Sequence, residues 1–344
     1  MAQDHAVGTP RLAVLGELLI RLSPPERQLL KQAASLDLFV GGAEANGAIG
    51  LASLAHDAGM ISRVSDNALG QRAIGSLRSA GVDCRHVAKS PGRMGLYFLT
   101  PGAGLRASEV VYDRAESSFA LTEASDIDWS VVLDDITHLH LSGITPALGR
   151  RSADLALAAA RAARDRNITL IFDGNYRERL WSAWDSDPRA ILTDLISMAD
   201  ILFGNHRDVA LLLGRDFSGA GTSRRREAAL AAFEAFPNLK LIASTARHVV
   251  DADCHRLSAR IDTPSGEAQT GEVSVSGIVD RIGAGDAFAA GALHALLWQN
   301  GDLEAVARSG LALAALKHSL PGDASLFGQA DIEAFLGGEL DVRR

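Results

Sequence analysis

The residues best suited to chemistry in this 344-residue chain lie near its C-terminal end, where two glycines precede a carboxylate. Residues 283–286 read GAGD, and an alanine-rich apolar segment follows them. The first N–H groups of a helix lack partners within the helix and carry partial positive charge, so a helix beginning here would offer an anion site. Glycine also lets a ligand approach the backbone closely. The motif indicates either such a site with a neighbouring acid or an ordinary helix start capped by Asp286.

Asp286 is better suited to moving a proton than to holding an anion. A carboxylate repels phosphate, but it can accept the proton of a hydroxyl group that attacks phosphorus. Phosphoryl transfer also requires that charge on the β- and γ-phosphate oxygens be neutralised, which implies Mg²⁺. The sequence shows no dense acidic cage, which suits a Mg²⁺ ion held mostly by the phosphate groups of the donor and by water. The residues that contact the metal stay unassigned.

Strand-like and helix-like segments alternate along most of the chain. Apolar, β-branched runs predict strands at 11–23, 61–65, 136–143, 168–175, 199–205 and 239–245. Apolar residues at three- and four-residue spacing predict helices within 39–60 and at 70–82, 150–167, 226–236, 302–318 and 329–336. This alternation predicts an α/β fold with a doubly wound, mainly parallel sheet and helices on both faces. Ligands of such sheets bind beyond the carboxyl ends of the strands.

One region without helices is expected to lie outside that sheet. Residues 93–114 contain two strand-like runs around a Pro/Gly-rich turn, which predicts a hairpin. We expect this hairpin, with parts of 17–40, to form a small β lid over the open edge of the sheet. Closure of the lid would exclude water from the site. The whole chain, 1–344, is expected to be a single domain.

Composition and charge argue against several kinds of partner. The chain has 34 basic and 42 acidic residues, a net charge of −8, which argues against nucleic acid or an anionic membrane as the main partner. It contains no apolar run of membrane-spanning length and no apolar signal core in its first ten residues, so we expect a soluble, cytoplasmic protein. Cys84 and Cys254 lack disulfide or zinc spacing and are expected to be reduced thiols.

Two other enzyme classes built on α/β sheets lack their motifs here. No G-x-G-x-x-G follows the first strand, which argues against a NAD-dependent oxidoreductase, and no G-x-x-x-x-G-K-[ST] is present for a P-loop ATPase. His138 and His140 lie two residues apart on a predicted strand. No third ligand is spaced nearby, so we expect ordinary strand residues rather than a metal pair.

Two separate segments resemble the signatures of the PfkB (ribokinase-like) carbohydrate kinase family. DRIGAGDAF, at 280–288, is similar to the C-terminal signature D-T-x-G-A-G-D-x-F, with Arg281 and Ile282 in place of the usual Thr-x. Residues 41–71, GGAEANGAIGLASLAHDAGMISRVSDNALGQ, are similar to the N-terminal signature. The resemblance covers essentially the whole chain. It implies the ribokinase-like fold and phosphate transfer from ATP to a sugar hydroxyl.

Narrower features resemble the 2-keto-3-deoxygluconate kinases of this family. They are GELLIRLSPP, GGAEAN, VVYDRAESSFA, HLSGITPAL and FDGNYRERLW. Glu17 stands where ribokinases and fructokinases usually carry the aspartate that holds sugar hydroxyls. The resemblance implies phosphorylation of the terminal hydroxyl of 2-keto-3-deoxygluconate to give 2-keto-3-deoxy-6-phosphogluconate. A family kinase for ribose, fructose, 5-keto-2-deoxygluconate or 2-keto-3-deoxygalactonate remains an alternative. A non-catalytic sugar sensor is a weaker one, because Asp286 and both glycines are retained.

The resemblance also implies a role for each site residue. Asp286 would be the base, with an anion hole formed by Gly283, Ala284 and Gly285. Substrate would be bound by Gly42, Asn46, Tyr97, Tyr112, Arg114 and Arg177. Both arginines suit a carboxylate through the planar fork of the guanidinium group, whereas Tyr97 could equally be an inward-facing strand aromatic. The nucleotide would be bound by Asn175, Asn205, Ser244, Thr245, Arg247, Gly283 and Gly285.

The sequence departs from the family pattern at two positions whose roles it does not assign, and it does not fix the oligomeric state. Asp208 replaces the glutamate of the N-x-x-E segment headed by Asn205, and its role is unassigned. Arg281 would either contact phosphate or point to solvent. Because lids of this family often pair between subunits, we expect a homo-oligomer, with a dimer formed through the lid.

Overall fold

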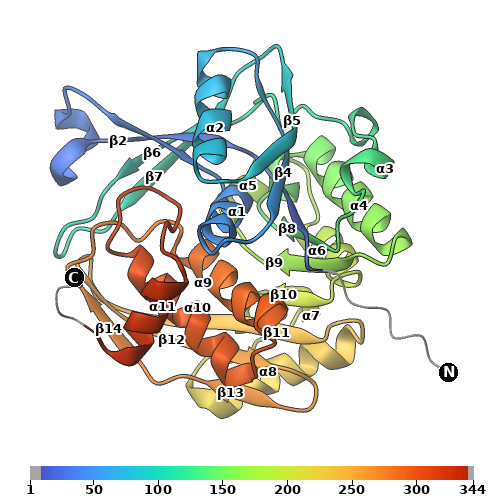
Figure 1. Cartoon of the computed structure of the whole chain (residues 1–344), viewed down its shortest axis with the longest axis vertical. Coiled ribbons are helices and arrows are strands. Elements are labelled where there is room, and N and C mark those ends of the chain that lie inside the picture. The colour runs from blue at the N-terminus through green and yellow to red at the C-terminus, as the bar shows by residue number, and fades with distance from the viewer. Residues whose placement is uncertain (1–8, 340–344) are drawn as a thin grey trace.

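The computed structural model describes residues 9–339, which form two β-sheets (Figure 1). Seven strands of the larger sheet are parallel: β1 (Leu12–Leu15), β4 (Ala58–Ser65), β5 (Asp83–Ser90), β8 (His138–Ser142), β9 (Thr169–Asp173), β10 (Ile201–Phe203) and β11 (Leu241–Asp251). Three more are antiparallel: β12 (Cys254–Asp262), β13 (Glu267–Gln269) and β14 (Val273–Ser276). The order is β13-β12-β11-β10-β9-β8-β1-β4-β5, with β14 paired to β12.

Helices cover both faces of this sheet. One face carries α1 (Ala43–Ser53), α2 (Ala68–Ser79), α9 (Ala284–Leu293), α10 (Leu303–Lys317) and α11 (Gln329–Gly337). The other carries α3 (Trp129–Val132), α4 (Arg150–Asp165), α5 (Glu178–Trp181), α6 (Pro188–Ile196), α7 (His206–Leu213) and α8 (Gly221–Ala235). Short 3₁₀ turns lie at Pro25–Arg27, Leu30–Gln32, Ala124–Asp126 and Pro146–Leu148, and a π-helical turn, His294–Trp298, continues α9.

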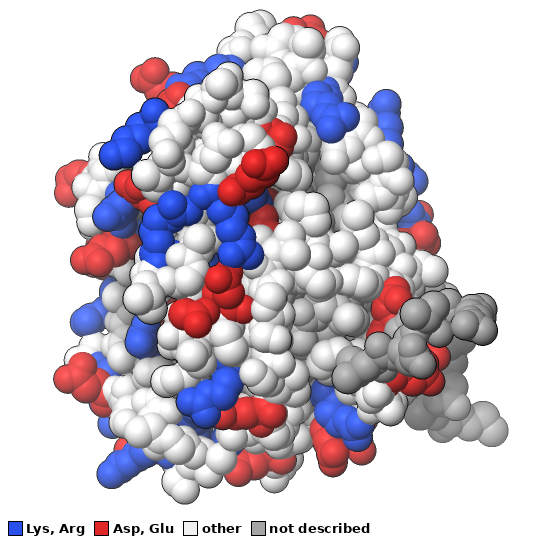
Figure 2. Space-filling model, turned by 90° about the vertical axis from the view of Figure 1, so that its left-hand side faces the viewer, with Lys and Arg blue, Asp and Glu red and all other residues white. Residues whose placement is uncertain are grey.

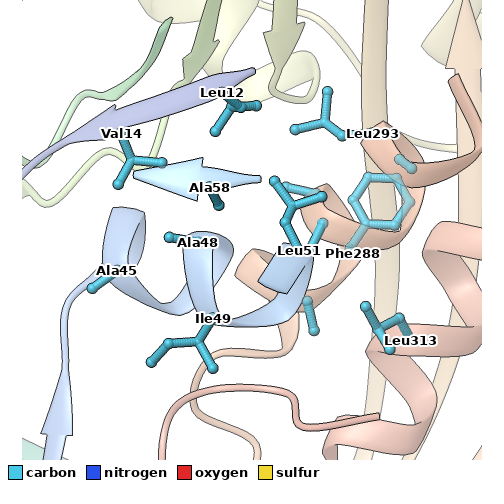
Figure 3. Close-up of a cluster of buried hydrophobic side chains, with 14 of the residues drawn as sticks. Leu12, Val14, Ala45, Ala48, Ile49, Leu51, Ala58, Phe288, Leu293 and Leu313 are labelled. Atoms are coloured by element: carbon cyan, nitrogen blue, oxygen red, sulfur yellow. The ribbon is translucent and has the colours of Figure 1, made fainter. Parts of the chain in front are cut away.

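The central strand β1 is buried on both faces, and its alternating side chains enter two separate hydrophobic cores. Leu12 and Val14 pack into the core under α1, α9 and α10, whereas Ala13 and Leu15 pack into the core under α4 and α6. Figure 3 shows α1 packed against the strands and lying beside α9, with Leu51 of α1 near Phe288 of α9. This packing fixes the start of α1 relative to the start of α9.

The smaller sheet consists of β2 (Leu19–Ser23), β3 (Asp37–Gly41), β6 (Gly95–Thr100) and β7 (Glu109–Asp113), in the order β3-β2-β6-β7. The single strand predicted at 11–23 is therefore wrong, because the chain leaves the large sheet after Leu15 and enters the small one at Leu19. The apolar pattern continues through this crossover. Gly16 permits it, since a Cβ atom there would lie 2.2 Å from Glu44 Oε2.

Other element boundaries also differ from the sequence pattern. The helix expected within 39–60 ends at Ser53, and Ala55 then adopts a positive φ of 63° before β4 begins at Ala58. The strand expected at 239–245 continues to Asp251 as one arm of the β11–β12 hairpin. Most residues of that extension are exposed, and its apolar residues do not alternate with polar ones, so the alternating strand pattern does not continue through it.

The predicted α/β class, with a mainly parallel sheet, helices on both faces and a separate small β-sheet, is confirmed. Both cysteines are free thiols. Among residues 9–339, no helix combines the length and apolar character needed to cross a membrane. The face in Figure 2 carries basic and acidic side chains interspersed, with one compact basic group bordered by acidic ones, rather than a continuous basic surface.

Candidate functional site

The GAGD motif forms the start of α9, as expected. Gly283 is the N-cap residue and lies in the left-handed region at φ 78°. A Cβ atom there would lie 1.6 Å from the carbonyl oxygen of Asp323, so this turn requires glycine. A Cβ atom on Gly285 would meet nothing within 4 Å, which leaves the first helical turn open to a ligand. No side chain caps this helix, so the alternative of Asp286 as an ordinary cap is excluded.

Asp286 is held by a residue from the N-terminal signature. Asn46 Nδ2, on α1, donates to Asp286 Oδ2 at 2.7 Å. Asn46 is 4% exposed, and its buried Oδ1 has no hydrogen-bond partner among the described residues. Gly42 is the N-cap of α1 at φ 141°, where a Cβ atom would lie 2.2 Å from the carbonyl oxygen of Glu17. Two motifs far apart in the chain therefore meet at one carboxylate.

The pKa of Asp286 is raised to about 7. Burial is the largest cause, because it disfavours the charged form; the Asn46 hydrogen bond acts in the opposite direction, and the carboxylate of Glu44 raises the pKa further. A carboxylate with this pKa can exchange a proton near neutral pH.

A second acid lies close by, at the carboxyl end of β9. Burial, followed by the charges of Asp286 and Asp208, raises the pKa of Asp173 to about 8. The negative charge of Asp286 is one cause of the raised pKa of Asp173, so the two acids titrate as a coupled pair. Within residues 9–339, no group of three or more His, Cys, Asp or Glu side chains is arranged to hold a metal ion. The site therefore offers acids for proton transfer rather than a closed metal cage.

Asn205 and Asp208 form the N-terminal cap of α7. The Asn205 side chain accepts from Arg207 N at 2.9 Å, and Asp208 Oδ2 accepts from Asn205 N at 2.7 Å. Asp208 thus shapes the start of this helix, a capping role that the sequence left open. Asn205 is exposed and lies beside the site.

Two adjoining cavities, of about 460 and 500 Å³, lie at the carboxyl ends of β9 and β10 and beside residues 244–247 within β11. Both are lined by Asn205, Ser244, Thr245, Arg247 and Gly285, and the second is also lined by Asn175 and Arg177. The first continues to apolar Leu257, Leu311 and Ala314. The sequence-predicted nucleotide residues are thus brought together, around a space polar at one end and apolar at the other.

Arg247 lines both cavities, and its charge interacts with that of the nearby Arg281. Arg247 and Arg281 form no ion pair within the described part of the chain. Burial, and then the charge of Arg281, lowers the pKa of Arg247. Two like charges held near each other without a counter-ion favour binding of an anion. The pair therefore suits a phosphate group.

Arg114 is buried behind the small sheet and is oriented by Glu17. Its Nε and Nη2 donate to Glu17 Oε2 at 2.8 and 2.5 Å, while Ser117 donates to the other Glu17 oxygen. Its Nη1 has no hydrogen-bond partner among residues 9–339, although Arg114 is only 5% exposed. Its guanidinium carbon lies 5.8 Å from the Tyr112 ring centroid. One N–H edge of a fixed guanidinium is thus left for an acceptor.

The remaining predicted substrate residues differ in their surroundings. The Tyr97 ring packs among Leu19 and Leu99, and its hydroxyl donates to Asp323, so that hydroxyl is already bonded. Arg177 is exposed at the wall of the second cavity, donates only to the carbonyl of Tyr176, and is close enough to lower the pKa of Asp286.

Sequence reasoning missed a buried charged group beneath the small sheet, formed by Arg21, Asp280, Lys317 and Asp323. Arg21 pairs with both aspartates, and Lys317 is 0% exposed. An arginine in the otherwise apolar strand LLIRLS was a usable signal, because a charge is rarely buried without a partner.

Comparison with known proteins identifies the family. Residues 9–327 match the pfkB family carbohydrate kinases. A 2-dehydro-3-deoxygalactonokinase of Haloferax volcanii is 30% identical over 341 residues, 98% of this chain and 100% of that protein. The chain is a carbohydrate kinase, and it belongs to the pfkB family.

Solved structures agree with this assignment. The 2-dehydro-3-deoxygluconokinase of Thermotoga maritima superposes with a TM-score of 0.90 at 32% identity, covering 96% of this chain and 100% of that chain. A candidate ribokinase II of E. coli, solved with ATP and Mg²⁺, has a TM-score of 0.80 at 21% identity, covering 96% and 100%. The second likeness concerns the fold.

The two glycines of the motif provide a matched test of the α9 start. We expect Gly283→Ala to lower the free energy of unfolding by more than about 2 kcal/mol, because its Cβ would collide with a backbone carbonyl at positive φ. Gly285→Ala should leave it within about 1 kcal/mol of the parent, since there is space for the methyl group. Urea unfolding measures both. Equal stabilities of the two variants would contradict the tight packing at Gly283.

Proposed function

We propose that this carbohydrate kinase uses ATP and Mg²⁺ to phosphorylate the terminal hydroxyl of 2-keto-3-deoxygluconate, giving 2-keto-3-deoxy-6-phosphogluconate. The observation that carries the reaction is Asp286, a carboxylate with a pKa near 7 held by Asn46 at the open N-terminus of α9. Relatives that act on the gluconate and galactonate forms support a keto-deoxy sugar acid as the substrate class.

In the proposed reaction, Asp286 accepts the proton of the sugar's terminal hydroxyl as its oxygen attacks the γ-phosphorus. The new O–P bond forms while the bond to the β–γ bridging oxygen breaks, and ADP leaves. N–H groups at the start of α9, from Gly283 to Gly285, face the charge that develops on the γ-phosphoryl oxygens. Asn46 favours the charged form of Asp286 and orients it.

The adjoining cavities suit a nucleoside triphosphate. Arg247 and the N-terminus of α9 would bind the phosphates. Ser244 and Thr245 would line the cavity between these two phosphate-binding groups. The apolar side chains of Leu257 and Leu311 would contact the nucleotide base. Bound Mg²⁺ neutralises charge on the β- and γ-phosphates. Without a ready acidic cage in the described residues, the ion would be held mainly by the triphosphate and water, close to Asp173 and Asp286.

The carboxylate of the substrate distinguishes it from ribose and fructose. Arg114, already fixed by Glu17, has an unused Nη1–H, and Arg177 is exposed beside the site. Arginine binds carboxylates through paired, planar hydrogen bonds. Gly42 and Asn46 lie at the start of α1, and Tyr112 and Ile282 pack against the same small cluster, so Gly42, Asn46 and Tyr112 would complete the pocket. We assign Tyr97 to its outer wall.

The proposal extends to the whole chain. Residues 1–344 would act as one kinase domain in the cytoplasm, with the small sheet as a lid, and two lids would pair to form a dimer. A kinase for the galactonate epimer, in which one hydroxyl group has the opposite orientation, is the second candidate, supported by the 30% identical Haloferax relative.

A substrate panel tests the assignment. ADP release is measured with 2-keto-3-deoxygluconate, 2-keto-3-deoxygalactonate, 5-keto-2-deoxygluconate, ribose and fructose. We expect kcat/KM for the 2-keto-3-deoxy acids to exceed that for ribose by about 10²-fold or more, because a fixed arginine left without its carboxylate is costly.

Asp286→Asn should lower kcat by at least ~10²-fold while retaining substrate binding. Preference for ribose would contradict the substrate, and binding without turnover would indicate a sensor.

The raised pKa of Asp286 predicts a pH dependence. Because the base must be ionised, kcat/KM should fall as the pH drops below about 7. Asn46→Ala removes a donor that favours the charged form, so we expect this acidic limb to move to higher pH by about one unit. An unchanged limb in Asn46→Ala, combined with loss of the limb in Asp173→Asn, would assign the titration to Asp173 instead.

The carboxylate contact is tested at the exposed arginine, where loss of the side chain should not affect folding. We expect Arg177→Ala to raise KM for the sugar acid about 10-fold and to leave KM for ATP within about 2-fold, since a charged hydrogen bond is lost. Arg179→Ala, two residues along and also exposed, is the matched control and should change neither value. Equal rises in both KM values for Arg177→Ala would place this arginine at the nucleotide.

A further inference from the structure

A buried group of charges joins the small sheet to the loops beside the α9 start. Arg21, on β2, pairs through Nη1 with Asp280 Oδ2 at 2.6 Å and with Asp323 Oδ1 at 2.7 Å. All three side chains are at most 7% exposed. Tyr97, on β6, donates its hydroxyl hydrogen to the other Asp323 oxygen. Neighbouring strands of the small sheet therefore hold one carboxylate between them, where the loop before α11 passes beneath the sheet (Figure 1).

Both carboxylates belong to segments that touch the Gly283 turn. Asp280 Oδ1 accepts from Ile282 N at 3.0 Å, which shapes the residues immediately before Gly283. Asp280 Oδ2 accepts from Gly322 N at 3.2 Å, which ties this segment to the neighbouring loop. The carbonyl of Asp323 packs directly on Gly283, with no room for a Cβ atom between them. Displacement of either carboxylate would therefore move the turn.

Lys317 completes the group from the end of α10. Its ammonium donates to the carbonyls of Asp280 and Leu320, at 3.3 and 3.2 Å. Two cations, Arg21 and Lys317, thus accompany two carboxylates, and their formal charges cancel. Such a buried arrangement contributes little net stability, but loss of one member leaves an uncompensated buried charge. The group is better suited to setting geometry than to stabilising the fold.

We propose that Arg21 is a positioning residue for phosphoryl transfer: through Asp280 and Asp323 it fixes the Gly283 turn against the small sheet, so that the N–H groups of α9 meet the transferred phosphoryl group. This inference rests on the proposed role of the α9 start as the anion hole. Donors of this kind act on charge that develops only in the transition state, so a small displacement lowers kcat while ground-state binding is kept.

The test compares Arg21→Lys and Arg21→Met with the parent protein. We expect Arg21→Met to lower kcat at least ~10-fold and to weaken binding of ADP with aluminium fluoride, a mimic of the transferred phosphoryl group, by a similar factor. Affinities for ADP alone and for the sugar acid should stay within about 3-fold. Arg21→Lys keeps the charge and should recover part of the loss, which also covers the case in which Arg21→Met does not fold.

A readout independent of turnover is hydrogen exchange in the peptide that spans 279–285. Both Arg21 variants should exchange faster there, because the Ile282 N–H is held by Asp280. The control is Asp200→Asn, a buried carboxylate at the amino end of β10 that bonds Leu170 N, Arg164 and Lys240. It should lower stability without changing kcat or this exchange.

Three results would overturn the inference. The first is an unchanged kcat in folded Arg21→Met. The second is an equal loss of affinity for ADP alone and for ADP with aluminium fluoride. The third is a hydrogen-exchange rate at 279–285 in the Arg21 variants that equals the rate in Asp200→Asn. The failure of the proposed function gives a different pattern, because the parent protein would then turn over none of the sugars or Asp286→Asn would be fully active. Exchange at 279–285 would still report whether Arg21 fixes the turn.

Discussion

The hydrogen bond from Asn46 to Asp286 is the contact on which the arrangement of the site depends. It joins the first turns of α1 and α9, which lie 240 residues apart in the chain. For the two turns to meet, both helices must pack on the same face of the sheet, and Leu51 and Phe288 in their shared core hold them there. Gly42 and Gly283 then allow each helix to begin in a space that leaves no room for a side chain.

The acidic and basic side chains around this contact are not paired with one another. Asp173 and Asp286 are half-buried acids with raised pKa values, whereas Arg247, which lines the cavities, and the nearby Arg281 have no acidic partners within the described residues. Acids that retain protons near neutral pH and unpaired cations form a site suited to receiving an anion. By contrast, the charge of Arg21 is compensated by two carboxylates, although its buried Nε has no hydrogen-bond partner among the described residues, so this charge serves the geometry of the loops rather than a ligand.

Much of this could be predicted from the sequence because the relevant signals are local. The glycines and polar residues of GGAEAN and GAGD predicted both helix starts, and alternating patterns predicted the parallel sheet and the separate hairpin. What could not be predicted depends on partners distant in the chain: the point between Leu15 and Leu19 at which the chain leaves the large sheet, and the bond of Tyr97 to Asp323. An apolar pattern records burial, but it does not record which sheet or which partner provides it.

The crossover of the chain from β1 to β2 separates two parts of the proposed site, one for phosphoryl transfer and one for the substrate. Segments around the large sheet carry the proposed base, Asp286, and the cavities proposed for the nucleotide, whereas the small-sheet region carries Glu17 and Arg114, the pair proposed for a sugar acid. Substrate preference can therefore diverge in the small sheet while the phosphoryl-transfer apparatus stays the same. Arg21 limits this modularity, because an exchanged sheet must still present a cation to Asp280 and Asp323. A chimeric kinase joined at this crossover would therefore need an arginine, or another cation, at the position of Arg21.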